Sequence, residues 1–204
     1  MAGRFISFEG GEGSGKSTQA RLLAEHLRNS GRTVVLTREP GGTAGAEAVR
    51  ALLVTGDPDR WSPWAEACLV NAARADHVAR VIRPALARGD WVICDRFVDS
   101  TRAYQGAGKG LDDAALCRLH ADVTGDLWPD RTIVMAVDVD EGLRRAGARQ
   151  DGEGRFEAHA LDFHARIAAF FGQLSSSEPG RCHAFDAHRP ITELAIDIAA
   201  WLAA

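Results

Sequence analysis

The chain is poor in cysteine, and its few cysteines are not arranged as metal ligands. They stand far apart in 204 residues, at Cys68, Cys94, Cys117 and Cys182. None forms a C-x-x-C pair, and no histidine pair stands near them at zinc-ligand spacing. A structural zinc site is therefore not expected. We expect buried, unpaired thiols in a reducing cytoplasm.

Long apolar runs and an excess of basic charge are also missing. No stretch approaches the roughly 18 consecutive apolar residues that a membrane span requires. The 24 Lys and Arg against 28 Asp and Glu give a net charge of −4, and the basic residues are not gathered into one run. We therefore expect neither a membrane partner nor a nucleic acid polymer, which needs a broad basic face. Small phosphorylated ligands need only a few well-placed cations.

The order of apolar patterns predicts the fold class. Hydrophobic residues make up 46% and charged residues 25% of the chain, which predicts one packed domain over residues 1–204. Strand-like runs stand at residues 5–8, 33–37, 91–94, 132–137 and 183–185. Helical patterns lie between them at 17–30, 46–54, 64–88 with Pro84 near its end, 111–123, 140–148, 157–174 and 191–202. The alternation predicts an α/β fold, a five-stranded parallel sheet flanked by helices, with ligands beyond the carboxyl ends of the strands.

A glycine-rich loop follows the first predicted strand. It reads Gly10, Gly11, Glu12, Gly13, Ser14, Gly15, Lys16, Ser17, Thr18 and fits G-x-x-x-x-G-K-[ST]. Glycines let backbone N–H groups turn toward phosphate oxygens, Lys16 supplies a charge for the β- and γ-phosphates, and the Ser17 hydroxyl suits Mg²⁺. The residues therefore predict ATP binding. A glycine-rich turn and a nucleotide-dependent switch are the alternatives.

The third predicted strand ends in a carboxylate and a cation. Asp95 is placed to hold Mg²⁺ or its waters, as the strand-end aspartate does in P-loop enzymes. Arg96 is placed to fork onto the phosphate of an acceptor. A strand-end ion pair without a substrate is the alternative.

Four segments, taken together, resemble the bacterial type of thymidylate kinase. They are FEGGEGSGKST, TREPGGT, NAARADH with IRPAL, and DRFVDSTRAYQG, and they stand in that family's order. The resemblance runs from about Phe5 to the end of the chain. It implies a P-loop nucleoside-monophosphate-kinase-like fold, a homodimer, Mg²⁺ as cofactor, and transfer of the ATP γ-phosphoryl group to dTMP to give dTDP for dTTP synthesis.

The resemblance also assigns the acceptor residues. It implies that Arg96 binds the dTMP phosphate, that Arg74 hydrogen-bonds the thymine edge, and that Tyr104 crowds the 2′ position. The whole implied dTMP set is Glu12, Arg38, Val70, Arg74, Arg96, Ser100, Thr101, Tyr104, Gln105 and Phe156. A cis Glu39–Pro40 peptide is a further expectation.

A glycine- and arginine-rich segment at about 147–156 reads as a lid. Phosphoryl transfer needs cations around the moving group, and the phosphate loop has no arginine between its glycines. The resemblance implies that the lid supplies one, Arg149 first and Arg155 second, beside Lys16 and Arg96. It places Glu157 in the metal region with Ser17 and Asp95. Arg144 and Arg145 read instead as a solvated helix end.

One position departs from the family pattern. Where the family stacks thymine on a phenylalanine one turn before Arg74, this chain has Val70. Either dTMP is still the acceptor, held with weaker stacking or by another aromatic such as Phe97, or the acceptor range extends to other pyrimidine monophosphates. A nucleoside kinase is a further alternative. His77, His159 and His164 are expected on helix surfaces, and Lys109 in a solvated turn.

Overall fold

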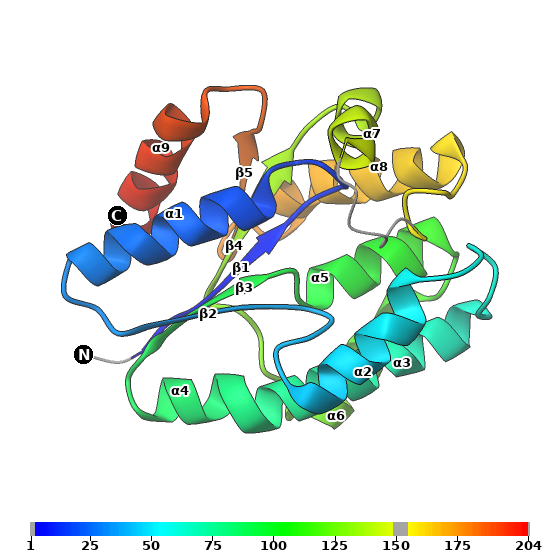
Figure 1. Cartoon of the computed structure of the whole chain (residues 1–204), viewed down its shortest axis with the longest axis horizontal. Coiled ribbons are helices and arrows are strands. Elements are labelled where there is room, and N and C mark those ends of the chain that lie inside the picture. Colours follow the sequence, from blue (N-terminus) through cyan, green and yellow to red (C-terminus); the bar gives the residue numbers. More distant parts are fainter. Residues whose placement is uncertain (1–2, 149–154, 204) are drawn as a thin grey trace.

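The computed structural model describes residues 3–148 and 155–203. Its centre is a five-stranded sheet in the order β2-β3-β1-β4-β5, in which every neighbouring pair is parallel (Figure 1). The strands are β1 (Phe5–Glu9), β2 (Val34–Arg38), β3 (Trp91–Asp95), β4 (Arg131–Ala136) and β5 (Cys182–Asp186). The predicted α/β class and the five parallel strands are confirmed.

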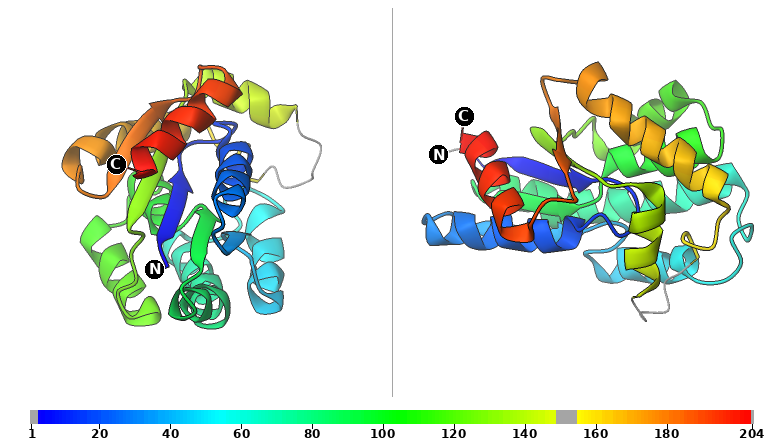
Figure 2. Two further views of the ribbon diagram at one scale, coloured as in Figure 1. Left: turned by 90° about the vertical axis from the view of Figure 1, so that its left-hand side faces the viewer. Right: turned by 90° about the horizontal axis from the view of Figure 1, so that it is seen from above.

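Helices cover both faces of this sheet (Figure 2). Their bounds are α1 (Lys16–Asn29), α2 (Ala44–Val54), α3 (Pro63–His77), α4 (Arg83–Ala87), α5 (Val98–Thr101), α6 (Asp113–Thr124), α7 (Val139–Gly147), α8 (Leu161–Ser177) and α9 (Ile191–Ala203). Two π-helical segments, η1 (Val78–Ile82) and η2 (Arg102–Gly108), extend α3 and α5. No helix in the described ranges is long and apolar enough to cross a membrane.

Alternation along the strands builds two cores. Successive side chains of a strand point to opposite faces of the sheet. Ile6 and Phe8 therefore pack under α1 and α9, while Phe5 packs with η1 and α4 on the other side. All three are at most 1% exposed. This burial holds β1 in the middle of the sheet and fixes where the phosphate loop leaves it.

Two helical predictions needed correction. The helix predicted over 64–88 is present as the consecutive segments α3, η1 and α4, so only its regularity is corrected: its turns widen in η1, because Pro84 has no N–H and its ring excludes the carbonyl four residues earlier. The segment after Arg96 has no predicted helix, yet α5 and η2 are helical there. Buried Val98 and Ala103 pin that segment to the core, and this tertiary packing overrides its weak local pattern.

The free thiols agree only partly with expectation. All four cysteines are unpaired, and Cys94 and Cys182 are buried. Cys68 is exposed on α3, which corrects the expectation that all four are buried.

Candidate active site

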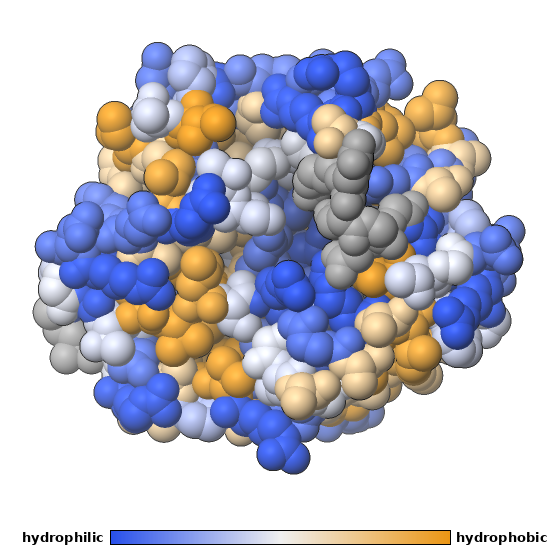
Figure 3. Space-filling model, in the orientation of Figure 1, coloured by the Kyte–Doolittle hydropathy of each residue, from blue (hydrophilic) through white to orange (hydrophobic). Residues whose placement is uncertain are grey.

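A cavity of about 490 Å³ opens at the carboxyl ends of β1, β2 and β3. Figure 3 shows it as a hollow lined mainly by hydrophilic residues. Most of the predicted site residues line it, namely Glu12, Gly13, Ser14, Gly15, Lys16, Ser17, Thr18, Arg38, Val70, Arg74, Asp95, Arg96, Ser100, Thr101, Tyr104, Gln105, Phe156 and Glu157. The structure thus gathers both predicted halves, the phosphate loop and the acceptor residues, around one space. Arg149 lies outside the described residues.

The phosphate loop has the backbone that its glycines predict. Gly10 and Gly13 have φ values of 138° and 62°, which L side chains rarely adopt. A Cβ at Gly13 would also lie 2.0 Å from the carbonyl oxygen of Gly142 in α7. The loop is therefore closely packed between β1 and α7, and α1 begins directly behind it with its positive end toward the cavity.

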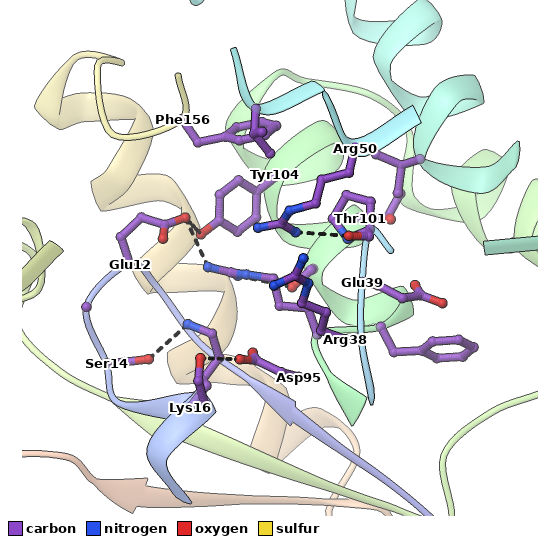
Figure 4. A pocket seen from close by; sticks show the side chains of 18 of the residues that line it. Glu12, Ser14, Lys16, Arg38, Glu39, Arg50, Asp95, Thr101, Tyr104 and Phe156 are labelled. Atoms are coloured by element: carbon purple, nitrogen blue, oxygen red, sulfur yellow. Dashed lines mark hydrogen bonds and ion pairs between the residues drawn. The ribbon is translucent and has the colours of Figure 1, made fainter. Parts of the chain in front are cut away.

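Lys16 lies across this loop. Its ammonium donates to the Gly11 carbonyl at 2.6 Å and to Ser14 Oγ at 3.1 Å (Figure 4). Burial first, and then the nearby charge of Arg96, lower the pKa of Lys16 to about 8. The positive charges of Lys16 and Arg96 therefore repel each other beside the loop. A phosphate anion bound between them would relieve this repulsion.

Oxygen ligands suited to a hard cation stand next to the lysine. The Ser17 hydroxyl donates a short hydrogen bond to Asp95 Oδ2, which joins the start of α1 to the end of β3. Glu157 lines the same cavity. Within 3–148 and 155–203, no group of three or more His, Cys, Asp or Glu forms a metal cage. Two oxygens beside a phosphate site fit Mg²⁺, which keeps several waters and shares the phosphates.

Glu12 organises the acceptor side of the loop. Its Oε1 accepts from Arg96 Nη2 at 3.0 Å and from the Tyr104 hydroxyl at 2.7 Å, and Figure 4 shows Glu12 and Tyr104 facing each other. The Arg96 guanidinium also lies 5.0 Å from the centroid of the Tyr104 ring. Burial lowers the pKa of Arg96, but the nearby charges of Glu12, Tyr104, Asp95 and Glu9 together outweigh it, so the net pKa is raised. Arg96 is therefore a permanent, oriented cation.

Arg96 stands in a turn that a second buried carboxylate holds. Arg96 itself has a φ of 71°, unusual for a side chain of this size. Glu9 accepts from the Phe97 backbone N–H at 2.7 Å and from Ser100 Oγ at 2.6 Å. Burial, with the charge of Asp99, raises the pKa of Glu9 to about 7. Glu9 is not among the assigned site residues; it directly follows the strand predicted at residues 5–8, and the structure shows that it holds this turn.

Arg74 is buried behind the acceptor pocket and nearly saturated with partners. It is 1% exposed and donates to Glu39 Oε2 at 2.8 Å and to Thr101 Oγ1 at 2.9 Å. The Phe97 carbonyl and Asn71 Oδ1 also accept from it, at 3.1 and 3.3 Å. With five N–H groups in all, one on Nη1 remains for a ligand.

Glu39 holds Arg74 from the second strand's loop. Its other oxygen lies 2.9 Å from His77 Nδ1, and His77 Nε2 lies 2.8 Å from Thr37 Oγ1. Because burial is opposed by Arg74 and His77, the pKa of Glu39 is lowered overall. The ionised carboxylate only accepts, so His77 must donate through Nδ1. The Glu39–Pro40 peptide is cis, as expected.

His77 is therefore not the surface residue that the sequence predicts. It is fully buried, and His164 is only 5% exposed. His77 faces the interior because Glu39 and Thr37, distant in sequence, supply its partners.

The expectations for Arg155 in the lid and for Lys109 in its turn also need correction. The Arg155 side chain is fully buried and donates to main-chain carbonyls after α2 and to Glu66. It does not line the cavity, so the structure does not support a catalytic role for it. Lys109 pairs with the same Glu66 at 3.0 Å and is 9% exposed, rather than solvated. The glycines next to Arg155 in the sequence led to the prediction of a lid. No local sequence pattern indicates that Glu66 is the partner of Arg155.

Six cavity residues were missing from the predicted set: Glu39, Pro40 and Phe97, described above, and Arg50, Val54 and Arg145. Arg50 of α2 lines the pocket and donates to the Pro40 carbonyl at 2.9 Å. Arg145 of α7 lines it near Gly13, while Arg144 is 71% exposed and pairs with Glu141. Val54 packs against Val70, which is 7% exposed. Amphipathic helix patterns alone do not reveal which of these side chains face a cavity.

Together these features define a class. A phosphate loop, a Ser17–Asp95 oxygen pair and an arginine-lined acceptor pocket on a parallel sheet are the parts of a P-loop kinase that acts on small phosphorylated molecules.

Comparisons with known proteins identify the family. The thymidylate kinase family model matches residues 8–198. The thymidylate kinase of Dinoroseobacter shibae is 54% identical, and the match covers 98% of this chain and 96% of that protein. The thymidylate kinase of Caulobacter vibrioides is 53% identical, and the match covers 91% of this chain and 88% of that protein. The crystal structure of thymidylate kinase from Ehrlichia chaffeensis matches with a TM-score of 0.79 at 35% identity, over 99% of both chains. The chain belongs to the thymidylate kinase family.

Proposed function

We propose that the chain transfers the γ-phosphoryl group of Mg-ATP to dTMP, giving ADP and dTDP. The observation that carries this proposal is one cavity lined by buried Lys16 and half-buried Arg96, with the phosphate loop on one side and Arg74, Thr101 and Tyr104 on the other. A donor phosphate and an acceptor phosphate placed there share the space between two fixed cations. Membership of the thymidylate kinase family supports the identity of the acceptor.

Catalysis then rests on alignment and charge. Lys16 and the backbone N–H groups of the loop hold the β- and γ-phosphates. Ser17 and Asp95, with Glu157 nearby, would hold Mg²⁺, which would supply positive charge against the phosphates. Arg96, oriented by Glu12, holds the acceptor phosphate in line. No covalent intermediate is needed. We propose Arg149 as the cation that stabilises the transferred group, and Arg145 is the described arginine nearest in sequence on the cavity wall.

The acceptor half of the cavity offers contacts for both the base and the sugar of a deoxynucleotide. Arg74 has one N–H left for a base oxygen, with Thr101 and Ser100 beside it. Tyr104 is 5% exposed and fixed by Glu12, so its ring can exclude a 2′ hydroxyl by contact. A nucleoside kinase would not need Arg96 facing a second phosphate, and a nucleotide switch would not need the Arg74 pocket.

The alternative function is a pyrimidine monophosphate kinase that accepts several pyrimidine monophosphates besides dTMP. Its support is Val70, whose side chain lies on the pocket wall with Val54 and offers no flat ring for stacking. Base stacking on an aromatic ring is worth about 1–3 kcal/mol.

A coupled assay of ADP release decides between these functions. The purified chain is given ATP and Mg²⁺ with dTMP, dUMP, dCMP, UMP or thymidine. The proposal expects dTMP to give the highest kcat/KM, thymidine to give none, and ATP loss without acceptor to be slow. Equal rates with dTMP and dCMP would favour the broader kinase, and ATP loss independent of acceptor would refute both. The Lys16→Met variant controls for contaminating kinases.

Two further properties accompany the proposal. We propose a homodimer, as the family resemblance implies, and light scattering at micromolar concentration tests it. The face of α3 that includes Ala67, Val70 and Ala73 is buried within the monomer, so these three residues are not available for the contact. A cytoplasmic location is proposed from the four unpaired thiols.

A further inference from the structure

The structure assigns a positioning role in acceptor binding to the buried ion pair between Glu66 and Arg155. We propose that this pair fixes, against one carboxylate, two segments that line the acceptor pocket, and so controls affinity for the nucleoside monophosphate. The proposal rests on the proposed function. Neither residue lines the cavity, and both side chains are fully buried.

Glu66 is the meeting point of three chain segments. Its Oε2 accepts from Arg155 Nη1 at 2.6 Å and from Lys109 Nζ at 3.0 Å, and its Oε1 accepts from Gln105 Nε2 at 2.9 Å. An ionised carboxylate only accepts, so it fixes which end of the Gln105 amide faces it. Gln105 lines the acceptor pocket beside Tyr104. Glu66 thereby orients one wall of the pocket from α3.

Arg155 secures a second part of the pocket wall. Besides Glu66, its guanidinium donates to the carbonyls of Leu53, Asp57 and Pro58 at 2.6 to 3.0 Å. Its backbone N–H donates to the Val54 carbonyl at 3.3 Å. The last carbonyls of a helix lack partners and carry partial negative charge, so a buried cation there caps α2.

This cap fixes residues that face the ligand. Helix α2 carries Arg50 and Val54 on the cavity wall, and it packs along α3 (Figure 1). The next residue after Arg155 is Phe156, whose ring lies edge-on to Tyr104 with centroids 5.6 Å apart. Phe156 also lines the pocket. Moving Arg155 therefore displaces α2 and Phe156 together.

The arrangement is costly unless it does more than fill the core. Taking two charges out of water is often no better for stability than well-packed apolar residues. Here the geometry of the pair is transmitted to Gln105, Val54 and Phe156, and misplacement of such groups by about 1 Å can cost orders of magnitude in a reaction. The pair is thus expected to act on acceptor binding and to leave the phosphate loop unaffected.

Kinetics of two core variants test the role. In Arg155→Lys the charge remains but the fork to three carbonyls is lost, and in Glu66→Gln the shape remains without the charge. We expect KM for dTMP to rise by about tenfold or more in each, while KM for ATP stays within about twofold. The matched control is Arg166→Met, which removes an arginine bonded to the Gly108 carbonyl at the end of η2, without contact to Glu66. It should leave both KM values unchanged.

The outcomes separate the possibilities. A lower Tm with unchanged KM for dTMP would show that the pair is only structural and would overturn the inference, as would equal rises in both KM values. If the core variants do not fold, Lys109→Met provides the second test, because Lys109, with a side chain 9% exposed, is the least buried of the three partners of Glu66; an unchanged KM for dTMP there also overturns the inference. If the wild-type chain itself does not phosphorylate dTMP, the proposed function fails instead.

Discussion

Replacing Arg74 by methionine tests the buried triad behind the acceptor pocket. Arg74→Met keeps length and removes charge, which leaves Glu39, whose side chain is 2% exposed, with only His77 as a charged or polar partner near its carboxylate. Breaking a buried pair by removing one partner costs about 3–5 kcal/mol. For a domain of this size each kcal/mol lowers Tm by about 2–4 °C. The expected fall in Tm is therefore about 6–20 °C.

The control for this experiment lies on the neighbouring turn. Arg80 pairs with Asp76 but is 72% exposed, so Arg80→Met should cost less than about 1 kcal/mol. Thermal unfolding followed by circular dichroism at pH 7 measures both variants. If Arg74→Met lowers Tm no more than Arg80→Met does, the buried pair contributes nothing net and the reasoning is wrong.

The pH dependence of this difference gives a second check. Arg74 and His77 hold the pKa of Glu39 below its usual 4.5. A group whose pKa is lowered by folding stabilises the fold above its unfolded pKa, and this stability is lost as pH falls through the folded pKa. The gap between wild type and Arg74→Met should thus be full above about pH 4.5 and shrink in more acid solution. A gap that widens below pH 4.5 would contradict the assignment.

Three further predictions concern catalysis. Val70→Phe should lower KM for dTMP by about fivefold or more with little change in kcat; a raised KM in steady-state assays would show that the pocket is built around valine and its neighbour Val54. Arg149→Ala should reduce kcat by about 10³, whereas Arg144→Ala, an exposed arginine paired with Glu141, should not; a change within twofold at Arg149 removes it from the mechanism. Because the pKa of Lys16 is lowered to about 8, KM for ATP should rise above that pH by up to about tenfold per unit, and a flat profile to pH 9.5 would sink this expectation.

Much of the site was predictable because its residues lie in short, continuous segments of the sequence. Residues 10–18 carry their own backbone requirements, and a parallel sheet brings the ends of its strands to one edge whatever the details of packing. Asp95, Arg96 and Ser17 therefore meet where the sequence places them. Even the bounds of the strands follow from their short apolar runs, to within a residue or two.

The pieces that failed share a different property. Arg155 and Glu66 are 89 positions apart, and His77 and Glu39 are 38 apart. Local pattern assigns an arginine among glycines to a lid, and it assigns a lysine in a turn and a helical histidine to solvent, since these types are usually exposed. Each becomes buried because a partner from another element neutralises or hydrogen-bonds it.

Sequence alone determined the fold class, the phosphate loop and the order of acceptor motifs, because these depend on short-range backbone and burial patterns. Only the tertiary structure decided which cations face the cavity and which form ion pairs behind the cavity wall. Lys16 and Arg96 line the space, whereas Arg155 and Lys109 converge on Glu66 behind it. The physical reason is that burying a charge requires an opposite charge in three dimensions, and no local pattern specifies where that partner lies.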